Sequence, residues 1–234
     1  MLSKRINSLP ASATLAMAAK ARELKNKGVD IIGLSLGEPD FNTPEFIKEA
    51  AIQAVRDNFN SYSPVDGYVD LKAAICEKFK RDNGLDYEPS QVVVSTGAKQ
   101  SIANVCMVLL NPGDEVLLPA PYWVSYSAIS TLAESKSIII NSSIENDFKI
   151  TPEQLEAAIT PKTKLVMFNS PNNPSGTIYT ESEYRRLGAV LKKYPNIYIL
   201  SDEIYEHINY GTPHFSIAAI SDLYDRTITV NGVA

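Results

Sequence analysis

The sequence has few cysteines and histidines, and it lacks long apolar runs. Its 234 residues include two cysteines and two histidines, and no apolar run approaches the roughly 20 residues of a membrane helix. Cys76 and Cys106 form no CxxC pair, so we interpret them as buried, reduced thiols. The spacing of His207 and His214 relative to nearby acidic residues matches no metal motif, and we expect no bound metal.

The chain also lacks the charge patterns of nucleic-acid and membrane-surface proteins. Its formal net charge is −5, and it has no basic run interleaved with aromatic residues. Lys4 and Arg5 precede a mostly apolar stretch at residues 9–19, as in a signal peptide, but serine and threonine residues interrupt that stretch. We therefore expect a cytoplasmic protein that binds neither nucleic acid nor membrane.

What the chain does contain is an alternation of strand and helix patterns. Hydrophobic residues make up 44% of it, enough for a sizeable core. The expected strands are residues 31–36, 91–95, 115–118, 137–141, 164–169, 197–201 and 226–230. The expected helices are residues 12–27, 44–54, 71–79, 98–110, 122–133, 152–159 and 181–193. This alternation predicts an α/β fold with a largely parallel sheet and helices on both faces.

The first forty-odd residues have a different character. They contain one expected helix, one short strand and a hinge rich in glycine and proline. We interpret residues 1–44 as an N-terminal arm and part of a small domain, and residues 45–234 as a large domain.

Two apolar runs end abruptly in polar groups. Residues 165–176 end in a segment that contains Asn173, and residues 198–206 end in one that contains Asp202 and Tyr205. Ligands of open α/β sheets bind just outside the carboxyl ends of such strands. The pattern therefore predicts that an amide, a carboxylate and a phenol meet at one crevice.

Each of these side chains has a simpler explanation as well. Asp202 suits a helix cap or a surface turn as readily as a carboxylate that pairs with a cationic ring nitrogen. For Asn173 and Tyr205, the simpler explanation is a role in a turn or in packing. The functional alternative is that each donates a hydrogen bond to a phenolate oxygen on the same ring. Trp123, the only tryptophan, suits either the core or a ring stack, because it follows an expected strand.

A glycine-containing turn at residues 95–100 opens an expected helix. Such a turn presents free backbone N–H groups and the positive end of the helix dipole, which suits a phosphate. It lacks the spacing of a Walker P-loop or a dinucleotide fingerprint, and an ordinary strand-to-helix turn explains it too.

Taken together, the motifs at 172–176 and 201–205 resemble the class I aminotransferases, which are pyridoxal-phosphate (PLP) enzymes of fold type I. Within that family the chain is most similar to the bacterial aspartate aminotransferase branch. Further segments resemble the family's hinge motif, dimer-contact loop, phosphate turn and stacking aromatic, at residues 37–41, 62–67, 97–100 and 121–123. The resemblance implies a seven-stranded type of mostly parallel sheet in a large PLP-binding domain, with the N-terminal part of a small α/β domain.

The resemblance also implies roles for individual residues. Asp202 would pair with the pyridinium nitrogen, and Asn173 and Tyr205 would hydrogen-bond the 3′-oxygen of the cofactor. Trp123 would stack on the ring. The phosphate would be held, mainly through backbone N–H groups, by Gly97, Ala98 and Lys99.

Two further roles involve the substrate and a second subunit. Gly37 would contact the α-carboxylate of the substrate through its backbone, and Trp123 and Asn173 would also line the substrate site. Tyr62 would reach the phosphate bound by a partner subunit, so the resemblance implies a homodimer with shared active sites.

The chain stops short of one family motif. Gly232, Val233 and Ala234 match the first three positions of the pattern that ends in the lysine forming a Schiff base with the cofactor. We therefore expect that lysine immediately after Ala234. Either the chain is a true fragment, or its sequence stops because the next residue is a cofactor-modified lysine. We favour the second explanation, since a cut at that position is improbable by chance.

The implied activity is transfer of an amino group between an amino acid and 2-oxoglutarate by a ping-pong mechanism. Aspartate is the first expected substrate, followed by aromatic acids and prephenate. Alternatives are a PLP-dependent carbon–sulfur lyase of the same fold, a non-catalytic pyridoxal-sensing module and, if the chain truly ends at Ala234, a non-catalytic fragment.

Overall fold

The computed structural model describes residues 2–9, 13–33, 37 and 41–233. The chain divides into two compact units, one made of Met1–Ile6 and Pro64–Ala234 and the other of Asn7–Ser63. Within the described residues, no helix has the length and apolar character needed to cross a membrane. The smaller unit contains helices α2 (Ala13–Asn26) and α3 (Glu45–Arg56).

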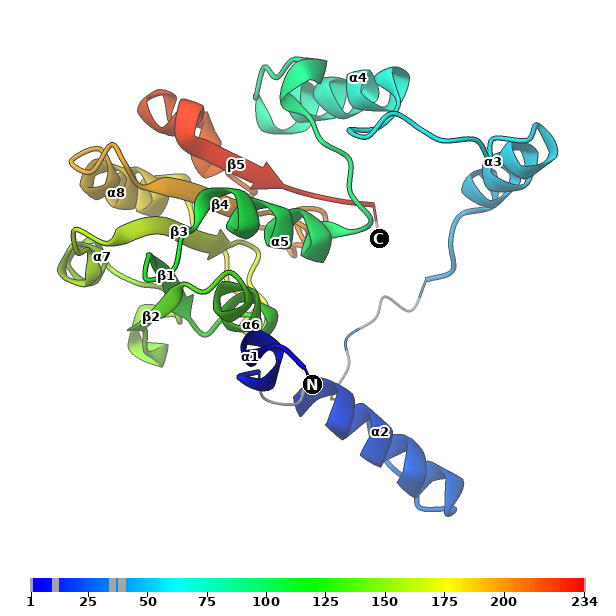
Figure 1. Cartoon of the computed structure of the whole chain (residues 1–234), viewed down its shortest axis with the longest axis horizontal. Coiled ribbons are helices and arrows are strands. Elements are labelled where there is room, and N and C mark those ends of the chain that lie inside the picture. Colours follow the sequence, from blue (N-terminus) through cyan, green and yellow to red (C-terminus); the bar gives the residue numbers. More distant parts are fainter. Residues whose placement is uncertain (1, 10–12, 34–36, 38–40, 234) are drawn as a thin grey trace. The chain divides into compact units, whose positions relative to one another are not determined.

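The larger unit is built on a five-stranded parallel sheet (Figure 1). The strand order is β2-β1-β3-β4-β5, so β3 lies at the centre. The strands are β1 (Glu115–Ala120), β2 (Lys136–Asn141), β3 (Thr163–Asn169), β4 (Tyr198–Asp202) and β5 (Thr227–Val230).

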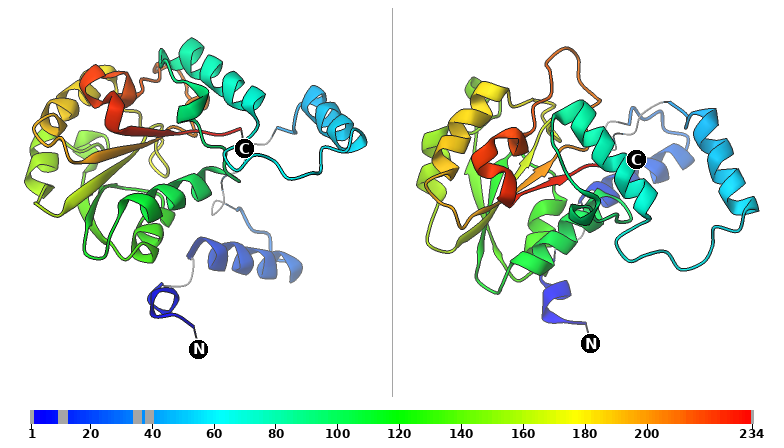
Figure 2. Two further views of the ribbon diagram at one scale, coloured as in Figure 1. Left: turned by 45° about the horizontal axis from the view of Figure 1, so that its top comes forward. Right: turned by 90° about the horizontal axis from the view of Figure 1, so that it is seen from above.

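Helices pack on both faces of this sheet (Figure 2). The α-helices of the larger unit are α4 (Val69–Lys78), α5 (Ala98–Leu109), α6 (Ser125–Leu132), α7 (Pro152–Ala158) and α8 (Glu181–Leu191). Helix α1 (Lys4–Asn7) spans the boundary between the two units. A short π-helix continues α4 at Phe79–Asn83. The 3-10 turns are η2 (Pro89–Gln91), η3 (Ile144–Asn146), η4 (Ile217–Ala219) and η5 (Ser221–Arg226).

The central strand shows why these residues form a doubly covered sheet. Val166 and Phe168 point into the cluster under α7 and α8, whereas Leu165 and Met167 point into the cluster under α5 and α6. All four are at most 2% exposed. Burial of each such side chain stabilises the fold by roughly 1.5–3 kcal/mol. The predicted α/β fold with helices on both faces is therefore confirmed. The buried central strands hold the starting points of the loops that follow them in fixed positions.

Capping boxes fix where two of the covering helices begin. At the start of α7, the Gln154 N–H donates to Thr151 Oγ1 at 3.3 Å, and the Thr151 N–H donates to Gln154 Oε1 at 2.8 Å. Thr180 and Glu183 make the same reciprocal pair at the start of α8. Each box satisfies backbone donors that the first helical turn leaves free.

The prediction of a strand at 91–95 was wrong. Gln91 ends a 3-10 turn, and Val92–Ser95 is not part of the sheet. The Val94 N–H donates to Asp66 O at 3.0 Å, and Val94 packs so closely on Gly67 that a Cβ there would lie 2.6 Å from its Cγ2. Val94 therefore bonds and packs against the turn at residues 66–67, and the segment does not pair with a strand of the sheet.

Other expectations shift or fall outside the described residues. The described residues form five strands, where the resemblance implies a seven-stranded type. Ile31–Gly33 is irregular, and the rest of the strand expected at 31–36 is not described. The cap Ser12, the hinge residues 38–40 and Ala234 also lie outside the described residues. Helix α6 begins at Ser125 rather than at Tyr122.

Candidate active site

The candidate site lies at the carboxyl ends of β3 and β4. Asn169 and Asp202, the last residues of these strands, are partners in the parallel register. Asn169 Nδ2 donates to Asp202 O at 3.0 Å, and Asn169 Oδ1 accepts the Asn173 N–H at 2.7 Å. One buried amide therefore fixes the loop after β3 against the end of β4.

The two predicted strand ends do meet. Asn173 Nδ2 donates to the Tyr205 hydroxyl oxygen at 3.2 Å, although the two residues are 32 positions apart. The loop that carries Asn173 is shaped by Asn172, whose Oδ1 accepts the Ser175 N–H at 3.1 Å and the Ser175 hydroxyl at 2.8 Å. Such side-chain turns are the common role of asparagine in loops. The amide and the phenol are therefore presented side by side.

Asp202 is almost fully buried, with 3% of its surface exposed. Its Oδ2 accepts the Tyr126 hydroxyl at 2.6 Å, and its Oδ1 accepts the Ile204 N–H at 3.2 Å. Among the described residues, no lysine, arginine or histidine forms an ion pair with it. Burial raises the pKa of the Asp202 carboxyl, and the hydrogen bonds from Tyr126 and Ile204 offset only part of that rise.

A chain of aromatic contacts leads from Asp202 to the glycine turn. The Tyr126 ring meets Trp123 edge to face, with centroids 5.5 Å apart and an interplanar angle of 89°. Lys99 Nζ lies 4.9 Å from the centroid of the Trp123 ring. Burial, together with the negative charge of Asp202, raises the pKa of Tyr126, so its hydroxyl keeps its proton and acts as a donor.

The glycine turn has the geometry of a helix N-terminus. Gly97 precedes the 12-residue helix α5 and has φ of +83°, a conformation that only glycine adopts without strain. The N–H groups of Ala98 and Lys99 belong to the first helical turn, which has no acceptors within the helix. The turn can therefore receive an anion, with Lys99 exposed beside it.

Gly37 and Tyr62 belong to the Asn7–Ser63 unit. Both are exposed within the described structure, and Tyr62 is fully so. Their expected contacts with substrate and with a partner's phosphate stay predictions.

Sequence reasoning missed Tyr126, Asn169 and Asn172. Tyr126 lies in a helix, and helical periodicity indicates that it is buried but not which polar group it meets. Asn169 and Asn172 border Asn173 in sequence, yet only the folded loop shows that they bind backbone groups. Asn172 Nδ2, for example, donates to Pro121 O at 3.2 Å, which ties this loop to the one carrying Trp123.

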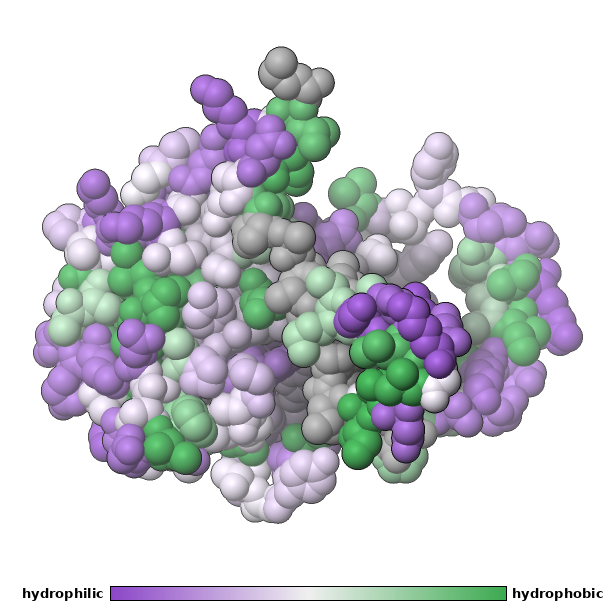
Figure 3. Space-filling model, turned by 90° about the horizontal axis from the view of Figure 1, so that it is seen from below, coloured by the Kyte–Doolittle hydropathy of each residue, from purple (hydrophilic) through white to green (hydrophobic). Residues whose placement is uncertain are grey.

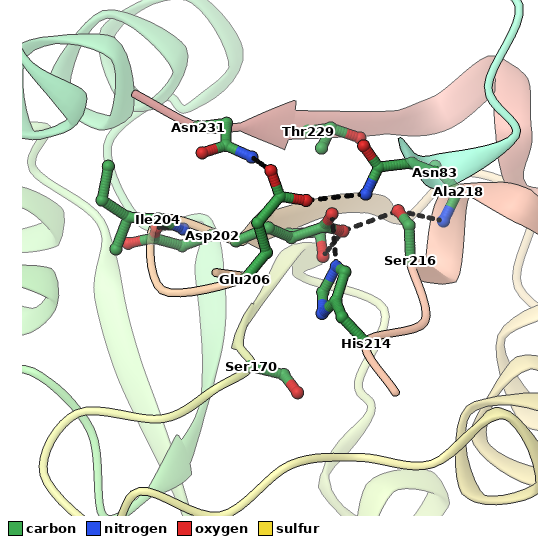
Figure 4. Close-up of polar contacts among 12 residues, drawn as sticks. Asn83, Ser170, Asp202, Ile204, Glu206, His214, Ser216, Ala218, Thr229 and Asn231 are labelled. Carbon is green, nitrogen blue, oxygen red and sulfur yellow. Dashed lines mark hydrogen bonds and ion pairs between the residues drawn. The ribbon is translucent and has the colours of Figure 1, made fainter. Parts of the chain in front are cut away.

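A second polar cluster surrounds Glu203, which is 1% exposed. Figure 4 labels its members Glu206, His214 and Ser216. Glu203 Oε1 accepts the hydroxyls of Ser201 at 2.8 Å and Ser216 at 2.6 Å, and Glu203 Oε2 pairs with His214 Nε2 at 2.9 Å. One ligand atom each from Glu203, Glu206 and His214 lies within 4.8 Å of the others. Because protein donors already satisfy these carboxylates, the geometry favours a hydrogen-bond network. The expectation of no bound metal stays a prediction.

We next compared the chain with known protein families and proteins. The family model for aminotransferase class I and II matches residues 29–234. The chain is 50% identical to the aspartate/prephenate aminotransferase of Nitrosomonas europaea, over all of this chain and 59% of that protein. It is 49% identical to the aspartate aminotransferase of Bacillus subtilis, over all of this chain and 60% of that protein.

The chain is also similar to solved structures of aspartate aminotransferases. The aspartate aminotransferase of Rhizobium meliloti matches with a TM-score of 0.96 at 46% identity, over all of this chain and 59% of that one. The Thermus thermophilus aspartate aminotransferase with maleate matches with a TM-score of 0.96 at 41% identity, over all of this chain and 60% of that one. The chain thus spans about three fifths of the length of these relatives. It belongs to the class I and II aminotransferase family.

Proposed function

We propose that the complete protein containing this chain is a PLP-dependent aminotransferase that transfers an amino group between an amino acid and 2-oxoglutarate. The observation that carries the proposal is the buried Asp202 carboxylate, which has only neutral donors and lies at the strand ends that carry the Asn173–Tyr205 pair. Aspartate is the first candidate substrate, because the similar proteins from Nitrosomonas europaea and Bacillus subtilis are named for it.

The residues present fit PLP. A buried carboxylate without a cationic partner suits the pyridinium nitrogen, which would supply the missing charge. The Asn173 amide and the Tyr205 hydroxyl suit the 3′-oxygen, and the N–H groups at Gly97–Lys99 suit the phosphate. When bound, PLP supplies a protonated ring that withdraws electrons from the substrate's Cα.

Asp202 would hold the proton on that ring nitrogen. An opposite charge at a partly buried site shifts a pKa by roughly 1–3 units, which is enough to keep the nitrogen protonated at neutral pH. Tyr126 and the Ile204 N–H hold one oxygen each, so the carboxylate is oriented before the cofactor arrives. Preorganisation of this kind lowers the barrier because no dipole has to reorient during the reaction.

Asn173 and Tyr205 would bind the 3′-oxygen together. Asn169 holds the backbone of Asn173, and Asn173 in turn contacts the Tyr205 hydroxyl, so the two donors are already adjacent. Trp123 would stack on the ring, supported by its edge contact with Tyr126. Lys99 would add positive charge near the phosphate.

The test is a panel of amino acids incubated with 2-oxoglutarate and the complete, PLP-loaded protein. The proposal expects glutamate and the matching keto acid, with aspartate among the best donors and ping-pong kinetics. Release of pyruvate and ammonia without a keto acceptor would identify the carbon–sulfur lyase instead. Formation of no glutamate from any amino acid would contradict the proposal.

A homodimer with shared sites, a cytoplasmic location and the division into residues 1–44 and 45–234 belong to the same proposal. The exposed apolar side chains of the smaller unit support a partner surface, because Phe46, Val55 and Phe59 are 75%, 78% and 69% exposed. Figure 3 shows apolar residues among hydrophilic ones at the molecular surface. In a dimer, Tyr62→Phe in one subunit would weaken PLP binding in the neighbouring subunit. Mixed dimers of a Tyr62→Phe subunit and an Asp202→Ala subunit would test this, because only one of their two sites would carry both changes.

A further inference from the structure

The chain beyond β5 runs along the turn that follows β4. The Glu203 N–H donates to Val230 O at 2.8 Å, which extends the main-chain contact of the two strands past the end of β4. Beyond it, Asn231 Nδ2 donates to Glu206 Oε1 at 2.8 Å (Figure 4). Asn231 Oδ1 accepts the Gly232 N–H, also at 2.8 Å. The Glu206 carboxylate is thus joined through the Asn231 side chain to the backbone of Gly232.

Glu206 is itself held from the opposite side. It is 5% exposed, and Lys78 at the end of α4 forms an ion pair with its Oε1. Asn83 Nδ2 donates to Glu206 Oε2 at 2.8 Å, and Lys78 Nζ also donates to Asn83 Oδ1 at 2.8 Å. The exposed ring of His207 adds a contact of 3.2 Å from its Nε2 to Oε1. A carboxylate with donors on both oxygens and a built-in cation has a fixed position.

Packing gives a second, independent sign of the same approach. A Cβ on Gly232 would lie 2.9 Å from Ile204 Cδ1, closer than real Cβ contacts allow. Ile204 belongs to the turn between Asp202 and Tyr205. The segment at 231–233 therefore touches this turn through its backbone as well as through Asn231.

We propose that Glu206 is a positioning residue that holds Asn231–Val233 against the turn carrying Asp202 and Tyr205. The functional consequence rests on the proposed function, since the cofactor lysine follows this segment in the family pattern. Glu206 is not among the residues proposed to bind cofactor or substrate. It would act by fixing the direction in which the chain leaves β5, and so the approach of the lysine to the ring.

Hydrogen exchange of the complete, PLP-free protein tests the positioning alone. Glu206→Gln removes the charge that binds Lys78 and orients Asn231. The variant keeps one acceptor oxygen but loses the charge, and its NH2 group replaces an oxygen that accepts a donor in the wild type. Because the charge-assisted contacts to Lys78 and Asn231 are weakened, we expect backbone exchange at residues 231–233 to quicken by about tenfold or more, with β3 unchanged. The control is Glu156→Gln, which breaks an exposed pair between Glu156 of α7 and Lys193, just beyond the end of α8. Exchange in the Glu206 variant within about twofold of wild type would overturn the proposal.

A steric variant tests the consequence for the cofactor. Gly232→Ala would place a Cβ 2.9 Å from Ile204 Cδ1, so either that side-chain end or the backbone at residue 232 must shift. A backbone shift should move the pH midpoint of the visible absorption of bound PLP. Adding Ile204→Val removes that one carbon and should restore the wild-type midpoint. A wild-type midpoint in both Gly232→Ala and Glu206→Gln would overturn the positioning role. If the wild-type protein neither binds PLP nor forms glutamate, the proposed function fails, while the exchange result still decides the positioning.

Discussion

Asp202 and Glu206 are two buried carboxylates four residues apart on one turn, yet their environments act on them in opposite directions. Burial raises the pKa of Asp202, and its two neutral donors do not cancel that effect. Burial also acts to raise the pKa of Glu206, but Asn83, Lys78 and Asn231 outweigh it and lower that pKa.

The difference lies in where the cation comes from. Glu206 has Lys78 from its own chain, so its charge is compensated as soon as the protein folds. Asp202 has Tyr126 and a backbone N–H, which orient it without neutralising it. A buried charge without a counterion is costly unless a ligand provides one. The comparison therefore separates a carboxylate whose charge is compensated within the chain from one whose charge a cationic ligand would compensate.

The largest expected effect is loss of activity in Asp202→Ala. On the proposed function, Asp202 would hold the proton on the ring nitrogen of PLP, so we expect the kcat of the complete protein to fall by about three orders of magnitude. Steady-state kinetics with aspartate and 2-oxoglutarate measure it. The exposed Asp222, which pairs with Lys192, provides the matched control Asp222→Ala. A loss smaller than about tenfold would remove Asp202 from this role.

Next in size is the loss of stability in Glu206→Gln. The variant should lose about 2 kcal/mol of unfolding free energy at neutral pH, the usual cost of losing a hydrogen-bonded charge. Because the folded pKa is lowered, this contribution is present above the ordinary value of 4.5 and disappears as pH falls through the folded pKa. Urea unfolding of the PLP-free protein across that range measures it. A deficit that persists unchanged in acid would contradict the assignment.

Tyr126→Phe should have a smaller effect. The variant keeps the ring packing against Trp123 but removes one of the two donors to Asp202, a loss of about 1 kcal/mol and roughly a fivefold lower kcat. The pKa of Asp202 should rise further, since the Tyr126 hydrogen bond lowers it. Tyr122→Phe serves as the control. Unchanged kinetics together with an unchanged Asp202 titration would show that the hydroxyl is dispensable.

The smallest expected effect has the opposite sign. Asp202→Asn should raise the melting temperature of the PLP-free protein at neutral pH. A carboxyl with a raised folded pKa binds its proton more tightly in the folded state, so stability falls as pH rises through that pKa. The gain should vanish below the ordinary value of 3.8. A lower melting temperature at neutral pH would indicate that the charge stabilises the fold.

The sequence was sufficient to predict the helices and strands that a local pattern of apolar residues marks. The apolar runs of β3 and β4 predict buried parallel strands, and parallel strands present their carboxyl ends at one edge, so the meeting of Asn173 with Tyr205 was predictable. The same reasoning failed at Val92–Ser95, because an apolar run does not show whether its partner is a strand or a turn such as 66–67.

Polar contacts between residues far apart in the chain could not be predicted from the sequence. The Tyr126–Asp202 bond joins residues 76 positions apart, and the Lys78–Glu206 pair joins residues 128 apart. Neither spacing follows a local period, so which carboxylate receives a cation and which receives a neutral hydroxyl appears only in the folded chain. That assignment sets the direction of both pKa shifts.

The most direct test of the account is titration of the Asp202 carboxyl by carbon NMR in the complete protein, without and with PLP, using inorganic phosphate as the control ligand. If the carboxylate is prepared for a cationic ring, PLP should lower the pKa of Asp202 from its raised value, while phosphate leaves it in place. A pKa that stays raised or rises further when PLP binds would contradict the account.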